Sequence, residues 1–463
     1  MDEYYGKFGA HPAVTSLHPA VLIIILAVCA YMFVTTKKRI AALFLVLSII
    51  IPMDQRLAVA GYNVFSIRIL IFCSWLPLLL TSRFKLAAIT SLDKIFIVWA
   101  VAKVVVWIVL WQNIPASTNI IGWMLTAFGI YFLFRVLITN TEDIDSLLRV
   151  LAVVSIVIAI SMLVEQITGR NLFAYLGSSS SLTEFTQIRG GKLRSQGPFQ
   201  HPICAGMFGA TLVPLFIMQI KAWKKSKNYG IIGLIAALVI VITSSSSGPM
   251  LSMLMGIVGL LCWVFRCQMR VLRWSALFVI IALHLVMKAP VWAIIAKVTV
   301  VGGSTGYHRV ELIDRFVTYF HEWWLLGTKD TGHWGYGMDD MINFFIVQGV
   351  QGGLLGFILF IVLIIRCYKI IGRKLRETGD LSEQFIFWGL GATLFTHIVG
   401  FFGIAYFDQQ VVMMYLLFAF ISMLACTNLK IAKNRSHILN NPRNINSIKV
   451  RRVDLQILSG VLF

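Results

Sequence analysis

The sequence predicts an all-α, polytopic integral membrane protein with about 12–13 transmembrane helices. Of its 463 residues, 58% are hydrophobic and 13% are charged, and the mean hydropathy is +0.83. Soluble chains are typically about 45–50% apolar and about 25% charged. The apolar residues also fall in blocks of about 15–25, long enough to cross a bilayer of roughly 30 Å. Together these observations exclude a soluble enzyme, a disordered chain and a nucleic-acid-binding module.

Each apolar block is predicted to be a helix, because a backbone in lipid must satisfy its own hydrogen bonds. The shortest blocks, such as 40–52, could be half-spans. The predicted helices lie at 20–36, 40–52, 64–81, 95–111, 120–138, 150–166, 201–220, 229–243, 248–265, 274–288, 343–366, 383–403 and 409–428.

This pattern divides the chain into membrane regions and two long connections. The N-terminal helices occupy 1–166, the central helices 201–288 and the C-terminal helices 343–428, followed by a basic tail at 429–463. The long connections are a basic loop at 167–200 and a large loop at 289–342. Alternate connections and the tail hold 27 of the 40 Lys and Arg residues, so this side is predicted to be cytoplasmic. Both long loops then face outward, where loops of this length are usually functional.

The first loop is rich in cations and ends at a helix start. Arg189, Lys192 and Arg194 lie within six residues, and His201 precedes a proline that opens the next span. Basic side chains beside the N–H groups of a helix N-terminus favour an anion. The segment is therefore a candidate diphosphate site. The alternative is a basic loop whose side chains reach lipid headgroups.

The second loop contains helical spacing of apolar residues at Val310, Ile313, Phe316, Val317, Phe320 and Trp324. We expect an amphipathic helix lying in the membrane interface, with the paired tryptophans in an interfacial belt. His308, Arg309 and Arg315 are its candidate substrate contacts. Arg315 lies four residues after Glu311, so these two could simply pair, which makes Arg309 the better ligand candidate.

Two adjacent carboxylates, Asp339 and Asp340, come just before the next span. They are costly to bury and should face water or a polar cavity, where either could accept a proton from a sugar hydroxyl. Asn343 is a candidate substrate contact. The alternative for these residues is capping of the following helix. No metal site is predicted, because no further oxygen ligands accompany the pair.

Three further polar features stand out in apolar surroundings. Arg68 and Lys103 fall inside hydrophobic blocks, where a charge costs roughly 2.5–3.5 kcal/mol on insertion scales; they should face a cavity, a partner or the interface. Glu165 ends a span beside the first loop and is expected to pair with a neighbouring cation. The hydroxyl-rich turn at 243–249 could line a polar cavity or simply join two spans.

The order of these motifs resembles the O-antigen ligase/polymerase superfamily. The similar features are Glu165 with Thr-Gly-Arg-Asn-Leu, Arg194 with Gly-Pro-Phe-x-His-Pro, Ser-Ser-Ser-Gly-Pro249, Arg309-Val-Glu-Leu, Gly335-x-Gly with Asp339 and Asn343-Phe-Phe, and Gly-Val-Gln-Gly-Gly353. The resemblance covers roughly 150–365 as scattered motifs. Ligases usually carry a His-Asn pair before the late span, whereas Asn343 here follows Ile342. The acidic residues are more similar to the Wzy-type polymerases of exopolysaccharide and capsule systems.

The resemblance implies a multi-pass bacterial inner-membrane glycosyltransferase of GT-C-like architecture, with its site facing the periplasm and its C-terminus in the cytoplasm. It implies a donor and an acceptor linked to undecaprenyl diphosphate, no metal or other cofactor, and a chain-length regulator and a flippase as partners. Arg194 and Arg309 would match the family's essential arginines, with Asp339 or Asp340 as base. The close alternative is a ligase that transfers glycan to lipid A–core. A flippase or other transporter is the remote alternative, which would place its charges within the spans.

Overall fold

The structure is a computed structural model, and it describes residues 15–53, 55–59, 61–81, 84, 88–177, 188–189, 191–294 and 306–439. For residues 189, 192, 408 and 427–439 it describes the backbone alone.

The long apolar helices are α2 (Pro19–Val34), α3 (Lys37–Ile50), α4 (Ser66–Leu80), α5 (Ser91–Trp111), α6 (Ile114–Leu137), α7 (Thr141–Thr168), α8 (Pro202–Ala222), α9 (Lys227–Thr243), α10 (Ser247–Leu261), α11 (Met269–Val286), α15 (Phe344–Glu377), α16 (Leu381–Phe401) and α17 (Asp408–Leu439). The connections contain β1 (Arg56–Val59), β2 (Tyr62–Phe65), η1 (Leu172–Leu176), β3 (Ile188–Arg189), β4 (Lys192–Leu193), η3 (Lys224–Ser226), η4 (Cys262–Gln268), η5 (Val291–Ala293), α13 (Gly306–Thr318), α14 (Phe320–Trp323) and η6 (Gly332–Trp334).

Every apolar block predicted from the sequence lies in a helix, which confirms the all-α class. Within the described residues, nine helical segments are long and apolar enough to cross a membrane, as expected for a multi-pass membrane protein. The predicted count was higher for two reasons. Helices α2, α3 and α4 have only 16, 14 and 15 residues, and α10 and α11 follow one another through η4 in a single 40-residue apolar segment.

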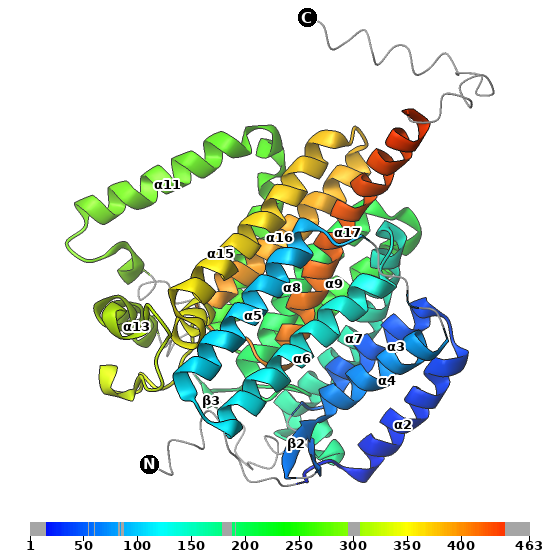
Figure 1. Cartoon of the computed structure of the whole chain (residues 1–463), viewed down its shortest axis with the longest axis horizontal. Coiled ribbons are helices and arrows are strands. Elements are labelled where there is room, and N and C mark those ends of the chain that lie inside the picture. The colour runs from blue at the N-terminus through cyan, green and yellow to red at the C-terminus, as the bar shows by residue number, and fades with distance from the viewer. Residues whose placement is uncertain are drawn as a thin grey trace, which may run out of the picture.

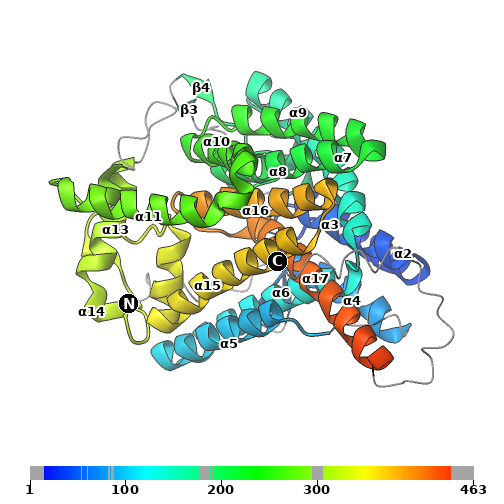
Figure 2. The same cartoon turned by 90° about the horizontal axis from the view of Figure 1, so that it is seen from above.

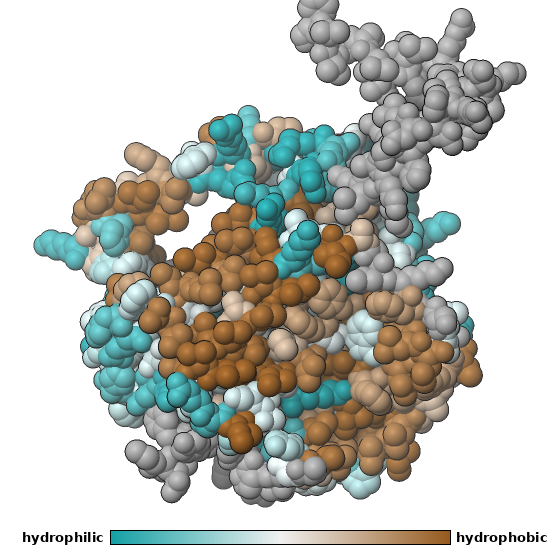
Figure 3. All heavy atoms as spheres, viewed as in Figure 1, coloured by the Kyte–Doolittle hydropathy of each residue, from teal (hydrophilic) through white to brown (hydrophobic). Residues whose placement is uncertain are grey.

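The helices form a tilted bundle with a shared core. Figure 1 shows α5, α6, α7, α15 and α16 running in roughly the same direction, with β2, β3 and α13 toward one end of the bundle. We call this end the loop side. Figure 2 shows α16 between α8 and α15, consistent with the contacts of α16 with α8, α10 and α15. Figure 3 shows a broad hydrophobic band across the middle of one face, with hydrophilic residues toward its edges.

Helix boundaries follow local sequence signals. Thr90 and Asp93 form a reciprocal capping box at the start of α5, which satisfies two otherwise unpaired N–H groups. Asn113 and Asn140 cap α6 and α7 through their side-chain oxygens. Helix α7 ends at Gly169, whose φ of 70° is left-handed, the conformation that glycine adopts at helix ends.

A buried polar cluster joins three of these helices at the end opposite the loop side. Both oxygens of Asp93 accept hydrogen bonds from Arg135 at 3.0 Å, and Asp93 also accepts from Tyr131 and Ser422. The side chains of Asp93 and Arg135 are 2% and 1% exposed. Because each charge is paired and hydrogen-bonded, burial is tolerated, and α5, α6 and α17 are linked by one network.

Helix α11 stands apart from this packing. None of its 18 residues is buried, and within the described part of the chain its main contacts are with η4 and η5. Figure 1 shows it projecting from the edge of the bundle. Many of its exposed side chains are large and apolar, including Trp274, Phe278 and Leu285, which are 65%, 72% and 78% exposed.

Candidate functional site

The end of the first long loop, residues 194–199, lies outside helices and strands and is held by hydrogen bonds from its surroundings. Ser195 donates from its N–H to the carbonyl of Thr243 and from its hydroxyl to the carbonyl of Met162. The Asn171 amide donates to the carbonyl of Gly197 at 2.8 Å. Helices α7 and α9 and the loop after α7 thereby satisfy a backbone that forms no regular structure of its own.

Glu165 is the central acceptor for this segment, and among the described residues its partners are backbone N–H groups rather than the cation expected from the sequence. Its carboxylate accepts the N–H of Gln196 at 3.1 Å and the N–H of Gly197 at 2.8 Å. Glu165 is only 3% exposed. Gly197 has a φ of 56°, so the chain turns there in a conformation that suits glycine, and this turn presents its N–H to the carboxylate.

Arg194, fixed by this segment, reaches the turn between α9 and α10. Its Nη2 donates to the Ser246 hydroxyl at 2.8 Å, and Arg194 is 7% exposed. Within the turn, Ser245 has a φ of 45°, a left-handed conformation that costs a non-glycine residue roughly 1–2 kcal/mol. We call residues Ser244–Gly248 the serine turn.

Arg309 approaches the same turn from the second loop. A Cβ placed on Gly248 would lie 3.6 Å from Arg309 Nη2, so the guanidinium lies directly over this glycine. Arg309 also donates to the carbonyl of Gly403 at 3.4 Å. Two arginines predicted as a pair from separate loops are thus brought to the serine turn, Arg194 at Ser246 and Arg309 at Gly248.

An apolar cavity of about 280 Å³ opens beside Arg309. Among the described residues that line it, Arg309 is the one charged side chain, and the other walls are mainly aliphatic and aromatic. They come from the start of α8, the first turns of α10 and the end of α16: Ile203, Met207, Gly248, Pro249, Leu251, Ser252, Val399, Gly400, Phe402, Gly403 and Ile404. A ligand bound here would meet hydrocarbon walls and one guanidinium.

Two helix N-termini add to the positive character of this region. Helix α10 begins at Ser247 and helix α8 at Pro202, and the first N–H groups of a helix have no partner within it. The Ser246 hydroxyl makes no cap hydrogen bond to α10; it donates instead to the carbonyl of Ser244 at 2.9 Å. Arginines together with helix N-termini make a favourable environment for an anion.

The second loop contains the amphipathic helix α13, and the apolar face predicted for it is only partly the buried one. Leu312 and Phe316 are buried, 0% and 8% exposed, whereas Val317 is 54% exposed. Leu312 and Phe316 belong to a cluster of buried side chains with Trp323, Trp334, Met338, Ile346 and Val350. The buried side of α13, with Leu312 and Phe316, packs against α15 and the loop. Of the tryptophan pair, Trp323 is buried and Trp324 is 45% exposed.

The second loop is also docked into a break in α15. At Gly353, φ is 62° and ψ is −169°, so the helix is interrupted inside its apolar length. The N–H of Leu354 donates to the carbonyl of Trp324, and the carbonyl of Val350 accepts from the N–H of Thr328. The loop therefore uses backbone groups that the break releases from the helix.

Asp339 and Asp340 lie between this docked loop and the start of α15. Asp340 is exposed and Asp339 is half-buried. The loop just before them packs on α13: a Cβ on Gly337 would lie 3.6 Å from His308, and one on Gly335 would lie 3.6 Å from Glu311. His308 precedes Arg309, so the carboxylate loop and the guanidinium are positioned by the same helix.

The other predicted residues have structural partners. Asn343 is 2% exposed and caps α15, accepting the N–H groups of Phe345 and Ile346 at 3.0 and 3.3 Å. His201 accepts the N–H of Ile203 at 3.1 Å, which caps α8. Arg315 pairs with Glu311 at 3.4 Å on the exposed face of α13, as the spacing suggested.

Arg189 and Lys192 face each other across the two-residue strands β3 and β4. Their side chains lie outside the described residues. In the described part of the chain, no three His, Cys, Asp or Glu side chains gather in a way that could hold a metal ion.

The sequence did not indicate the residues at the end of α16 that also line the cavity. Gly403 and Gly400 line the cavity, and Gly400 lies close to the Tyr406 hydroxyl, which contacts Nδ1 of the buried His397 at 2.9 Å. The only sequence signal for them is a pair of glycines at the end of a predicted span, which is common in membrane helices.

Neither the models of known protein families nor the curated proteins contain a match to this chain.

Proposed function

We propose that this protein is a membrane glycosyltransferase of GT-C-like architecture that polymerises undecaprenyl-diphosphate-linked repeat units of a surface polysaccharide at the periplasmic face of the inner membrane. One observation carries the proposal: Arg194 and Arg309, from two different loops, reach the same serine turn at Ser246 and Gly248, and Arg309 lines an apolar cavity there. A lipid diphosphate needs this combination, a pair of cations next to a hydrocarbon surface.

In this proposal the two guanidiniums hold the diphosphate of the donor. Arginine suits this role because its planar group donates two parallel hydrogen bonds to phosphate oxygens and keeps its charge. The N-terminus of α10 adds N–H donors and a positive partial charge. The first isoprene units would occupy the cavity lined by α8, α10 and α16.

The chemistry is a displacement at the anomeric carbon. The hydroxyl of the acceptor attacks this carbon, the bond from it to the diphosphate oxygen breaks, and the diphosphate leaves with the electron pair. Arg194 and Arg309 stabilise the charge that develops on the leaving group. The hydroxyl proton passes to the carboxylate of Asp339 or Asp340, and the configuration inverts.

The partners follow from this role. The donor and acceptor are lipid-linked glycans delivered from the cytoplasmic leaflet by a flippase, and a chain-length regulator sets when polymerisation stops. The transfer needs no metal or other cofactor in this proposal, and the C-terminal tail lies in the cytoplasm.

The test compares surface and lipid-linked glycan in a deletion strain complemented with the wild type, Arg309→Ala or the control Arg170→Gln. Arg170 is an exposed arginine on the loop side, at the end of α7. A polymerase predicts single repeat units in the deletion and Arg309→Ala strains, and long polymer with Arg170→Gln.

Other outcomes identify the alternatives. Full-length polymer retained on its lipid carrier and missing from the lipid A–core would identify a ligase. Repeat units accumulating in the cytoplasmic leaflet would identify a flippase. Glycan unchanged in every strain would overturn the transferase proposal.

A further inference from the structure

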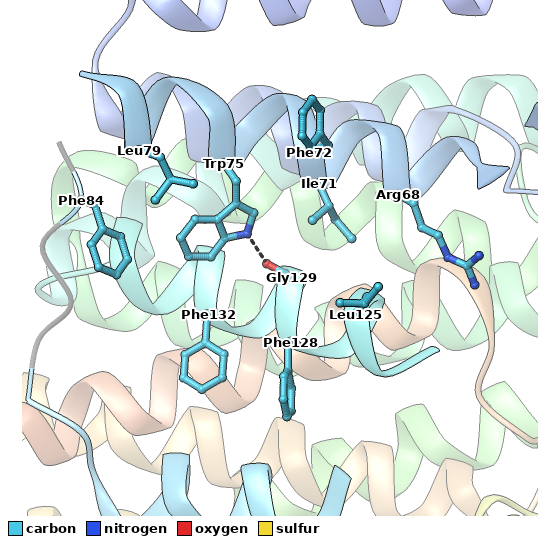
Figure 4. Close-up of a pocket in the computed structure, with 10 residues that line it drawn as sticks. All are labelled: Arg68, Ile71, Phe72, Trp75, Leu79, Phe84, Leu125, Phe128, Gly129 and Phe132. Carbon is cyan, nitrogen blue, oxygen red and sulfur yellow. Dashed lines mark hydrogen bonds between the residues drawn. The ribbon is translucent and has the colours of Figure 1, made fainter. Parts of the chain in front are cut away.

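A second apolar recess, larger than the cavity at Arg309, lies between α4 and α6. It has a volume of about 620 Å³ and shares no lining residue with that cavity. Its lining is aromatic and aliphatic apart from Arg68 and Gly129: Ile71, Phe72, Trp75, Leu79, Phe84, Leu125, Phe128 and Phe132. Figure 4 shows Arg68 at one end and Phe84 at the other. We call this recess the α4–α6 groove.

The groove exists because small residues bring α6 close to α4 along part of their length. A Cβ on Gly122 would lie 2.6 Å from Arg68 Nη2, and one on Gly129 would lie 2.5 Å from Ile71. Trp75 bridges the helices by donating to the Gly129 carbonyl at 3.0 Å. Such close approach is typical of helices packed in membranes, and it leaves the larger side chains to form the walls of the groove.

The groove is open along its side, and its lining includes exposed apolar side chains. Phe72, Leu79 and Leu125 are 65%, 58% and 60% exposed. From Arg68 to Leu79 the helix rises about 16 Å, at 1.5 Å per residue. That length is close to half of a hydrocarbon core of roughly 30 Å, the depth of one leaflet.

Arg68 gives the groove a charged end. Its Nε donates to Thr126 and its Nη1 to the carbonyl of Asn63, at 3.4 and 3.3 Å, and its guanidinium lies 5.3 Å from the centre of the Phe65 ring. These partners are all uncharged. Among the described residues, no carboxylate forms an ion pair with Arg68, although a charge in an apolar segment normally has an anionic partner or reaches water.

We propose that the α4–α6 groove binds an anionic phospholipid, with the phosphate on Arg68 and one acyl chain lying along α4 and α6 toward Phe84. Charge complementarity selects the headgroup, since a guanidinium binds phosphate oxygens in parallel. The length of the groove, close to the depth of one leaflet, matches the length of one acyl chain. This site is independent of the proposed glycosyltransferase activity, because it uses neither Arg194 nor Arg309.

The test measures binding of phosphatidylglycerol to the purified full chain by native mass spectrometry, with phosphatidylcholine of the same acyl chains for comparison. We expect the wild type to bind phosphatidylglycerol more tightly. Arg68→Gln should weaken that binding about tenfold or more, as for loss of a charge-assisted hydrogen bond. Arg170→Gln removes an exposed arginine on the loop side outside the groove and should leave binding unchanged.

A second pair of variants tests the groove without altering Arg68. Leu125→Trp fills the groove from an exposed position and should weaken binding of both phospholipids. Leu163→Trp, at a lipid-exposed position of α7 that is 40% exposed, is the matched control and should bind as the wild type does.

Four results would overturn the proposal. Unaltered phosphatidylglycerol binding by Arg68→Gln would mean that the headgroup does not bind at Arg68. Unaltered binding by Leu125→Trp would mean that the acyl chain does not lie in the groove. Displacement of phosphatidylglycerol by inorganic phosphate alone would mean that only the anion is recognised. Displacement by equimolar undecaprenyl phosphate would assign the groove to the lipid carrier instead.

Discussion

The N–H of Leu354, just past the break in α15, donates a hydrogen bond to the carbonyl of Trp324 at 2.8 Å. The loop that carries Asp339 and Asp340 is therefore attached to the bundle through backbone as well as side chains. Gly353 permits this attachment by its positive φ, and Gly327, with a φ of 80°, permits the chain to pass close to the carbonyl of Val350.

Gly353→Ala should undock this loop. The new Cβ would lie 2.5 Å from the Leu325 carbonyl oxygen, and a backbone with φ 62° and ψ −169° is essentially restricted to glycine and costs other residues roughly 1–3 kcal/mol. We expect a lower melting temperature and faster proteolysis within the loop. Gly379→Ala is the control, because nothing lies within 4 Å of its Cβ position. Equal behaviour of both variants would contradict this account of the break.

Glu165→Gln should loosen the segment that holds Arg194. The amide keeps one acceptor oxygen but turns N–H donors toward the N–H groups of Gln196 and Gly197, so about 1.5–3 kcal/mol of stability should be lost. Polymer yield should fall with it. Glu142→Gln, at an exposed position in the first turn of α7, should change the melting temperature little; a similar drop there would count against a special role for Glu165.

Arg309→Lys should retain less activity than its conserved charge suggests. Lysine supplies a mobile point charge and loses the paired hydrogen bonds to a diphosphate, so we expect polymer formation about 10²-fold slower, in the range for loss of one transition-state donor. In vitro polymerisation of lipid-linked repeat units measures this rate. Full activity of Arg309→Lys would mean that charge alone suffices and that no fixed geometry is needed.

Asp339→Asn should have a larger effect than Asp340→Asn. Asp339 is half-buried and Asp340 exposed, and a general base must be held near its substrate to contribute its usual factor of about 10²–10⁴. The two rates are compared in the same assay, with thermal unfolding to verify that both variants fold. If each carboxamide variant polymerises normally, neither aspartate is the base.

Arg135→Met should destabilise the bundle by about 3–5 kcal/mol, because it leaves the buried carboxylate of Asp93 without its cation. Thermal unfolding in detergent measures the loss, and Asp93→Asn in the same background should restore part of it. Arg315→Gln, which removes the partner of Glu311 in an ion pair exposed on both sides, should cost less than about 1 kcal/mol. A mild effect of Arg135→Met would mean that water reaches Asp93.

The helices could be predicted because lipid imposes one rule on every apolar block, and all thirteen blocks lie in helices. Whether each helix is long enough to span a membrane depended on where its caps lie. It also depended on η4, which joins α10 to α11 in one apolar segment. The buried face of α13 could be predicted only in part. Phe316 was on the predicted face, but Leu312 and Val317 are equally apolar and only the packing against α15 distinguishes them.

The arginines of the candidate site could be predicted from the sequence, but the way in which the fold brings them together could not. Arg194 and Arg309 stand out in sequence because they are charged residues in a largely apolar chain. Their meeting point at Ser246 and Gly248 depends on how α8, α10 and α16 pack, and no local pattern encodes that. Glu165 was assigned to a cation because the competing acceptor role needs Gly197 in a left-handed turn, which only the folded chain reveals.

Among the described residues, helix α11 touches little besides its own flanking turns, so in a membrane we expect lipid to surround most of it. The tilt and depth of α11 should then depend on the lipid or detergent around it. The thickness of the surrounding hydrocarbon would set its position, as packing against a neighbouring helix does for the other helices. Extraction into a short-chain detergent changes the thickness of the hydrocarbon around α11, whereas a nanodisc keeps a bilayer around it. Preparations that agree on the position of every other helix should therefore differ in the position of α11.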